Sequence, residues 1–156
     1  KRYLDVETVD FSVNELGKPY HKEIAGKQTV NFNISHSGEF ILEGFAVGMD
    51  IGVDVQEMAG CPDYREIAGN FYTAEEAEDV INEGPELFFQ YWAAKEAYVK
   101  AIGIGLGRGM DFFSVRNGKI TEKGRKGQGW HLYPVKIEGY AAYVAAHKKG
   151  DKSNEL

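Results

Sequence analysis

The longest pattern of apolar and polar positions in the chain covers residues 85–103 and predicts one central helix. Pro85 suits the first turn of such a helix, and Gly103 suits a left-handed cap at its end. Apolar and small residues recur along it at three- and four-residue spacing, which is the repeat of a helix face that packs on a core. The residues on this predicted face are Leu87, Tyr91, Ala94, Tyr98 and Ala101.

A polar stripe accompanies this apolar face. Trp92, Glu96 and Lys100 follow one another at four-residue spacing, and Lys95 lies beside them. Taken alone, Glu96 and Lys100 would form an ordinary exposed ion pair worth only ~0.3 to 0.5 kcal/mol. The alternative is that one carboxylate and two ammonium groups project together near a core, where they would do chemistry.

Strands are predicted on both sides of the helix. Residues 29–35 alternate between apolar and polar positions, which is typical of a strand. Further strands are predicted at 40–47, 51–55, 112–116, 130–135 and 140–146. Residues 48–50 indicate a hairpin turn between the second and third strands, and Asn117-Gly118 indicates another.

Two shorter helices are predicted ahead of the central one. The first covers residues 64–71. The second begins at Thr73, because Thr73 and Glu76 have the spacing of a capping box, and it ends near Ile81.

Composition limits the class of protein. With 156 residues the chain fits one domain or two small halves that share a core. No apolar run approaches the ~18 residues that span a bilayer. Cys61 is the only cysteine, which excludes an internal disulfide and a zinc site built on thiolates, and fits a reducing cytoplasm. The net charge of −6 argues against a general nucleic-acid binder.

Polar residues gather at the ends of two predicted strands and on the central helix. They are Ser35, His36, Asp54, Gln56, Glu96 and Lys100. Asp54 and Glu96 are hard oxygen donors of the kind that hold Mg²⁺. Lys100, His36 and the loop cation Lys18 could neutralise phosphate oxygens, and phosphoryl transfer asks chiefly for positioning and charge neutralisation. Each residue taken singly would more often be structural: a satisfied histidine, a turn aspartate or a solvated lysine.

Three of these segments resemble, in order and spacing, the motifs of a known family. They read Asn-Ile-Ser-His-Ser-Gly at 33–38, Ile-Gly-Val-Asp-Val at 51–55 and Trp-Ala-Ala-Lys-Glu-Ala-Tyr-Val-Lys at 92–100. They look like the motifs of the 4′-phosphopantetheinyl transferases of the surfactin type. Gly-Lys-Pro at 17–19 and the segment 103–107 are similar to the same family, and the resemblance covers residues 14–146.

The resemblance implies an α+β fold with antiparallel sheets, each packed with a helix, in two halves related by a pseudo-twofold axis. Coenzyme A would bind in the cleft between the halves. Residues 1–48 would be the remainder of the first half, apparently truncated at its N-terminus. Residues 49–147 would form the second half, which carries the metal site, and residues 148–156 a polar tail.

The activity implied is Mg²⁺-dependent transfer of the phosphopantetheine arm from coenzyme A to a serine of an apo acyl or peptidyl carrier protein, with release of 3′,5′-ADP. Asp54 and Glu96 would be metal ligands, and Glu96 would also be the general base, directly or through water. Lys100 would contact the pyrophosphate. The nucleotide and its 3′-phosphate would be held by Lys18, Ser35 and His36. Trp92 and Lys95 would shape and orient the helix.

Two departures from the family pattern affect these expectations. Many relatives carry a second acid two residues after the aspartate, where this chain has Gln56, and the adjacent Glu57 points to the opposite face of the strand. Gln56 would therefore ligate Mg²⁺ weakly or through water, and we expect weaker metal binding. Relatives also have a further N-terminal segment. Without it, an unpaired edge or exposed apolar patch would favour dimerisation, so a monomer and a dimer both remain open.

Two other functions are compatible with the sequence. A catalytically weak protein would bind coenzyme A or a carrier without turnover. A Mg²⁺-dependent phosphohydrolase would release phosphate with no carrier present, but the sequence lacks the clustered acids of a two-metal site. Docking of an acidic carrier would need a local basic patch, for which Arg65, Arg108 and Lys95 are candidates. The loop at residues 58–71 would read the carrier, whose identity the sequence leaves open.

Overall fold

The computed structural model describes residues 10–13, 19–21, 30–105, 109–122, 125–126 and 129–148. In chain order the elements are β1 (Phe11–Val13), β2 (Pro19–His21), β3 (Val30–Ser37), β4 (Phe40–Val47), β5 (Met49–Glu57), α1 (Tyr64–Phe71), α2 (Ala74–Glu83), α3 (Pro85–Ile102), β6 (Phe113–Ser114), a 3₁₀ turn (Arg116–Gly118), β7 (Thr121–Glu122), β8 (Arg125–Lys126), β9 (Trp130–Pro134) and β10 (Tyr140–Lys148). The strand pairs are antiparallel, so the α+β class with antiparallel sheets is confirmed.

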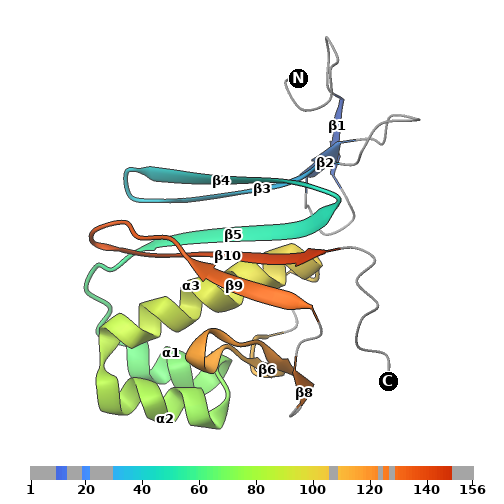
Figure 1. Cartoon of the computed structure of the whole chain (residues 1–156). Coiled ribbons are helices and arrows are strands. Elements are labelled where there is room, and N and C mark those ends of the chain that lie inside the picture. The colour runs from blue at the N-terminus through green and yellow to red at the C-terminus, as the bar shows by residue number, and fades with distance from the viewer. Residues whose placement is uncertain are drawn as a thin grey trace.

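The elements form stacked layers (Figure 1). The β3–β4 hairpin packs against β5, with β3 along the edge of that strand that does not pair with β10, and α3 covers a face of the sheet formed by β5, β10 and β9, with α1 and α2 beyond it. Strand β5 is an edge strand of this sheet, and its residues 51–55 are all buried because both of its faces are covered. The middle of β5 is therefore held between the hairpin and the central helix.

Gly52 lets β5 and α3 approach closely. A Cβ atom at this position would overlap the backbone oxygen of Ala97 and the backbone nitrogen of Ala101. Only glycine fits such a contact without moving the helix. The next residue on the same face of β5 is Asp54, so this contact also sets how closely Asp54 lies to the helix.

The sequence signals for the helices are confirmed. Thr73 and Glu76 form the capping box of α2, with each side chain accepting from the other's backbone N–H. The central helix begins at Pro85, and Gly103 follows it in the left-handed conformation, with φ 73°. Of the face predicted to pack on the core, Ala94 and Tyr98 are each 3% exposed.

The predicted hairpin turn at residues 48–50 is wrong. Strands β4 and β5 are consecutive but do not pair with each other: β4 pairs with β3, and β5 pairs with β10. Gly48 has φ 65° and β5 begins directly after it. The chain turns at this glycine, but the hairpin contacts the free edge of β5 through β3 side chains and not through a backbone ladder. Residues 117–118 do turn the chain between the paired strands β6 and β7, as predicted.

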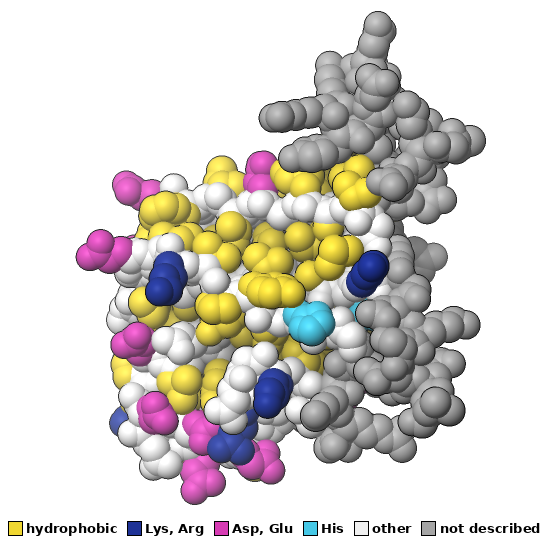
Figure 2. Space-filling model, in the orientation of Figure 1, with side chains coloured by type: hydrophobic (Ala, Val, Ile, Leu, Met, Phe, Trp, Pro, Cys, Tyr) yellow, Lys and Arg dark blue, Asp and Glu magenta, His cyan; other side chains and the backbone are white. Residues whose placement is uncertain are grey.

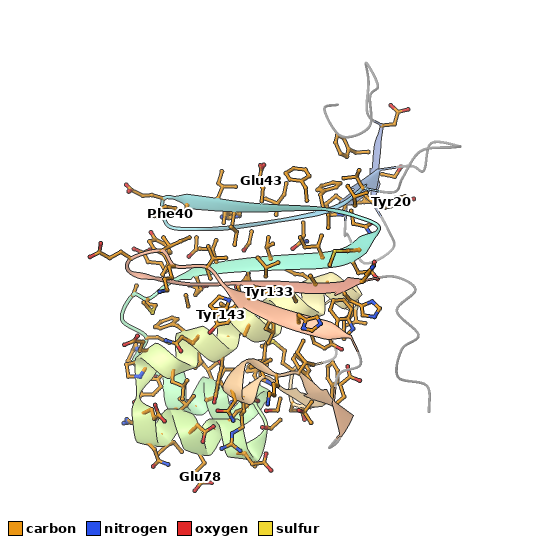
Figure 3. All side chains as sticks on the ribbon, in the orientation of Figure 1. Tyr20, Phe40, Glu43, Glu78, Tyr133 and Tyr143 are labelled. Atoms are coloured by element: carbon orange, nitrogen blue, oxygen red, sulfur yellow. The ribbon has the colours of Figure 1, made fainter. Side chains whose placement is uncertain are left out.

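The outer face of the β3–β4 hairpin exposes apolar side chains. Figure 2 shows apolar side chains over the strand layers in the upper half of the view, where this outer face is seen only along its upper rim. Ile34, Ile41, Phe45 and Val47 are each at least 41% exposed. Glu43 also points away from the sheet on this face (Figure 3). The exposed apolar patch expected from the sequence is present, and dimerisation stays a prediction.

Within the described residues, no helix combines the length and the apolar composition that crossing a bilayer requires.

Candidate active site

Asp54, Lys100 and Ser35 meet where β5, α3 and β3 come together. The Lys100 ammonium group lies 2.6 Å from Asp54 Oδ1. Ser35 donates its hydroxyl hydrogen to the same oxygen at 2.8 Å. Asp54 and Ser35 are 5% and 6% exposed, so this cluster is partly removed from water. Three residues far apart in the sequence thus form one charged, hydrogen-bonded group.

Burial raises the pKa of Asp54, and the neighbouring Lys100 charge and the hydrogen bonds from Lys100 and Ser35 oppose that shift. The lysine and the serine are therefore the two groups that favour the ionised aspartate. An ionised carboxylate is the form that binds a metal ion or balances a cation.

Glu96 lies one helical turn before Lys100 and is 7% exposed. Burial raises the pKa of Glu96 to about 7, the negative charge of Asp54 adds to the shift, and Lys100 opposes it. In the described part of the chain no hydrogen bond or ion pair joins the Glu96 carboxylate to another residue. The simple interpretation of an exposed Glu96–Lys100 pair is therefore wrong, because Lys100 pairs with Asp54 and Glu96 is buried.

Other residues of the predicted site lie apart from this cluster. His36 is exposed and opposite Ile41 in the hairpin register, and alternation along the strand places its side chain on the opposite face from Ser35. The half-buried Gln56 donates its side-chain amide hydrogen to the backbone oxygen of Glu57 at 3.3 Å. Lys18 and Arg108 lie outside the described residues.

Lys95 does not share the polar stripe with its neighbours, and its proposed role as a docking cation is wrong. Its side chain is fully buried, with Nζ 2.7 Å from Glu76 Oε2. It also donates to the backbone oxygens of Met110 and Phe113. Burial lowers the pKa of Lys95, and the Glu76 carboxylate opposes that shift. The other described docking candidate, Arg65, is exposed.

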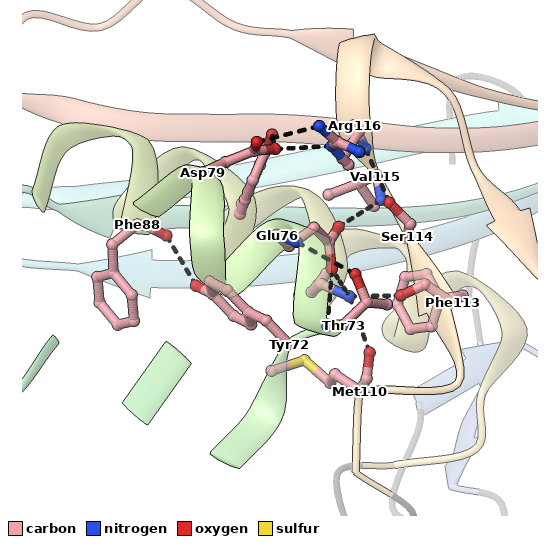
Figure 4. A network of polar contacts seen from close by, with 12 residues as sticks. Tyr72, Thr73, Glu76, Asp79, Phe88, Met110, Phe113, Ser114, Val115 and Arg116 are labelled. Carbon is pink, nitrogen blue, oxygen red and sulfur yellow. Dashed lines mark hydrogen bonds and ion pairs between the residues drawn. The ribbon is translucent and has the colours of Figure 1, made fainter. Parts of the chain in front are cut away.

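Glu76 connects three parts of the fold. Figure 4 shows its carboxylate accepting from the backbone N–H of Thr73 and of Val115. Together with Lys95 it therefore joins the start of α2, the middle of α3 and the segment around β6. The sequence identified Glu76 only as a capping residue, and no sequence signal marked it as the partner of Lys95.

Two further polar side chains of β3, which the sequence analysis did not single out, bind the backbone of β5 on either side of the site. Asn33 Oδ1 accepts from Val53 N at 2.8 Å, and Ser37 Oγ accepts from Glu57 N at 2.9 Å. The signal for them was the alternation along β3, whose polar face turns toward β5. The apolar residue Ile34, on the other face, is 44% exposed.

The donor set is compatible with Mg²⁺. Among the residues that the structure describes, no group of three or more His, Cys, Asp or Glu side chains is placed to hold a metal ion. Two carboxylates, Asp54 and Glu96, are close enough for the charge of one to shift the pKa of the other, and the positive charge of Lys100 opposes the raised pKa of both. Mg²⁺ is commonly bound by one or two carboxylates, with water and substrate phosphates completing its shell.

Comparison with known proteins identifies relatives for most of the chain. Residues 50–146 match the family described as the 4′-phosphopantetheinyl transferase superfamily. A 4′-phosphopantetheinyl transferase of Bacillus subtilis is 36% identical over 117 residues, which are 72% of this chain and 50% of that protein. The 4′-phosphopantetheinyl transferase psf-1 of Bacillus pumilus is 32% identical over 126 residues, 78% of this chain and 50% of that protein.

Two further similarities are more distant. The L-aminoadipate-semialdehyde dehydrogenase-phosphopantetheinyl transferase of Rattus norvegicus is 26% identical over 161 residues, which are 85% of this chain and 52% of that protein. The crystal structure of the Thermotoga maritima holo-[acyl-carrier-protein] synthase superimposes with a TM-score of 0.47 at 20% identity, covering 67% of this chain and 70% of that one. The chain spans about half the length of the curated relatives it matches.

Proposed function

Because the chain belongs to the 4′-phosphopantetheinyl transferase superfamily, we propose that it transfers the phosphopantetheine arm of coenzyme A to a serine of an apo acyl or peptidyl carrier protein. The reaction requires Mg²⁺ and releases 3′,5′-ADP. The observation that carries the proposal is the buried Asp54–Lys100–Ser35 cluster beside Glu96. These residues are the ones to which the family resemblance assigns metal binding, phosphate contact and proton transfer.

The chemistry assigned to these residues is a single displacement at phosphorus. The serine oxygen of the carrier forms a bond to the phosphorus that bears pantetheine, and the bond from that phosphorus to the bridging pyrophosphate oxygen breaks. The serine proton passes to Glu96, directly or through water. A carboxylate with a pKa of about 7 suits this transfer near neutral pH, because it is partly ionised and still basic.

Charge balance in the site supports the same assignment. Lys100 would contact the pyrophosphate, whose negative charge it can neutralise while it remains close to Asp54. Asp54 and Glu96 would hold Mg²⁺, with Gln56 contributing weakly or through water. When bound, the metal ion would supply further neutralisation of the pyrophosphate charge. Lys18 and His36 are proposed to hold the nucleotide. The contacts of Ser35 do not support such a role for its hydroxyl.

We also propose the two-halves organisation implied by the family, with a boundary between residues 48 and 49. Two observations support it: the family match begins at residue 50, and the β3–β4 hairpin forms a layer separate from the sheet of β5. Coenzyme A would bind in the cleft between the two halves and the carrier would dock near residues 58–71. A cytoplasmic location completes the proposal, on the ground of the single free Cys61.

A test is intact-mass spectrometry of an apo carrier protein incubated with this chain, coenzyme A and Mg²⁺. We expect a mass gain of one phosphopantetheine arm. Glu96→Ala should abolish it, whereas the matched control Glu78→Ala, at an exposed carboxylate on α2, should not (Figure 3). Absence of the gain with several carriers would contradict the proposal.

A weak binding protein is the second candidate, because Gln56 stands where many relatives have an acid and its amide donates to its own neighbour. It would bind coenzyme A, measured by calorimetry, without modifying any carrier. Release of inorganic phosphate without a carrier would instead identify the phosphohydrolase.

A further inference from the structure

The free edge of β5 is satisfied by side chains and not by another strand. On one side β5 pairs with β10, and on the other side three alternate backbone N–H groups, at residues 53, 55 and 57, donate to side chains of β3. The donors and acceptors are Val53 N to Asn33 Oδ1, Val55 N to Ser35 Oγ and Glu57 N to Ser37 Oγ, at 2.8, 3.3 and 2.9 Å. We call these three β3 side chains the polar ladder.

Ser35 differs from the rest of the polar ladder because it also touches the charged site. Its oxygen accepts from Val55 N and from Lys100 Nζ, the latter at 3.1 Å. Its hydrogen goes to Asp54 Oδ1, an acceptor that carries no hydrogen of its own when ionised. A hydroxyl has one hydrogen to donate and two lone pairs to accept with, so all three capacities of Ser35 are used inside the protein.

Because the hydrogen and both lone pairs of the Ser35 hydroxyl are already used, they limit how this serine could contact coenzyme A. A phosphate oxygen of coenzyme A accepts hydrogen bonds, so Ser35 could bind it only by withdrawing its hydrogen from Asp54. That exchange would remove a donor from a carboxylate that is only 5% exposed. The serine is itself 6% exposed and faces β5, which leaves little room for a nucleotide at its oxygen.

We propose that Ser35 is a positioning residue: its hydroxyl fixes the Asp54 carboxylate and the Lys100 ammonium group on the β5 edge, and it does not bind the nucleotide. This rests on the proposed function, in which Asp54 is a metal ligand. Partners that orient a ligating carboxylate act on metal affinity, and their loss typically weakens it by about 10-fold or more. The polar ladder fixes the position of Ser35 along β5, because Asn33 and Ser37, two residues away on each side, fix the register of β3 against β5.

The chain offers a matched set of variants. Ser35→Ala removes the hydroxyl, and Ser35→Thr keeps it. Ser37→Ala removes a polar-ladder hydroxyl that also accepts from a β5 backbone N–H, but no hydrogen bond joins Ser37 to Asp54 or Lys100 among the described residues. A defect that follows from a weakened ladder alone would appear in both alanine variants, whereas a defect in positioning would appear only at Ser35.

The experiment compares binding of Mg²⁺ alone and of coenzyme A alone by calorimetry for the full chain and these variants. We expect Ser35→Ala to weaken Mg²⁺ binding by about 10-fold, with Ser35→Thr and Ser37→Ala close to wild type. Coenzyme A binding should be unchanged in all of them. Equal Mg²⁺ affinities for Ser35→Ala and Ser37→Ala, or weaker coenzyme A binding by Ser35→Ala, would overturn the proposal.

Kinetics separate this inference from the proposed function. If wild-type protein modifies a carrier, Ser35→Ala should lower kcat and raise the Mg²⁺ requirement while the KM for coenzyme A stays constant. A raised KM with constant kcat would indicate a nucleotide ligand and overturn the proposal. If wild-type protein modifies no carrier, the proposed function fails, and the two binding measurements still decide the role of Ser35.

Discussion

The ammonium group of Lys95 lies 2.7 Å from the carboxylate of Glu76, and neither side chain is exposed to solvent. The pair crosses from α3 to α2, and Lys95 is the residue immediately before Glu96. A charged pair in the core thus fixes the helix at the point where the adjacent side chain enters the candidate active site. The same lysine also lies over the ring of Phe113, 4.3 Å from its centroid.

Removing one member of this pair should be costly. Lys95→Met fills a similar volume but leaves the Glu76 charge buried with only backbone donors, so we expect a loss of about 3 kcal/mol in the free energy of unfolding. Urea denaturation measures it. The double variant Lys95→Met with Glu76→Gln should recover much of the loss, since Gln keeps an acceptor for Val115 N and carries no charge. Wild-type stability for Lys95→Met would contradict this assignment.

How much of this the sequence predicted depends on the range of the contacts. The capping box of Thr73 and Glu76 was predicted, because both partners lie within one turn of helix. The partnership of Glu76 with Lys95 was not, because it depends on how α2 packs against α3. Successive residues on a helix are rotated by about 100°, so Lys95 can turn into the core while Glu96 faces β5. The spacing alone did not distinguish these two directions.

The candidate active site shows the same difference between residues that the sequence identified and tertiary contacts that it did not. Asp54, Glu96 and Lys100 were selected from motif order, and the structure brings them together. Ser35 was selected too, but its contacts could not be read from the sequence, because they depend on the β3–β4 hairpin packing along the free edge of β5. Local patterns predicted both β3 and β5, whereas the packing of β3 against β5 is a tertiary contact that no local pattern specifies.

Gly52 should be intolerant of a side chain. Gly52→Ala places a methyl group against the backbone of α3 at Ala97 and Ala101, so the helix must move away from β5. We expect a destabilisation of about 1 to 3 kcal/mol, the usual cost of overpacking, and reduced carrier modification because Lys100 moves relative to Asp54. Gly60→Ala is the control, since nothing lies within 4 Å of a Cβ there. Equal unfolding midpoints for the two variants would refute the close approach.

Glu96 should make the stability of the metal-free protein depend on pH. Its pKa is raised to about 7 from an ordinary value of 4.5, so the folded state holds the proton more tightly than the unfolded state. The resulting stability is fully present below about pH 4.5 and is lost as the pH rises through about 7, a change on the order of 3 kcal/mol at most. Glu96→Gln removes this titration.

Urea denaturation in EDTA at pH 5 and pH 8 tests the sign. Groups that are not electrostatically coupled to Glu96 titrate alike in wild type and Glu96→Gln, so they cancel when the two proteins are compared at each pH; the coupled groups Asp54 and Lys100 contribute to the same difference. The free energy of unfolding of wild type minus that of the variant should be smaller at pH 8 than at pH 5. A difference that is constant, or that grows with pH, would mean that burial does not raise the pKa of Glu96.

Gln56→Glu should lower the Mg²⁺ concentration that gives half-maximal carrier modification. The residue lies on β5 two positions after Asp54, hence on the same face of the strand, and it is half-buried. A neutral amide oxygen is a weaker ligand for Mg²⁺ than a carboxylate. The native amide donates to the backbone oxygen of Glu57, which a glutamate cannot do, so its carboxylate is released toward the metal.

Glu57→Gln provides the matched control for this substitution. Glu57 is exposed and its side chain alternates to the other face of β5, so loss of its charge should leave the Mg²⁺ requirement unchanged. A similar shift in both variants would attribute the effect to net charge near the strand end. An unchanged or higher requirement in Gln56→Glu alone would show that the side chain at position 56 does not contribute to metal binding, and would contradict this prediction.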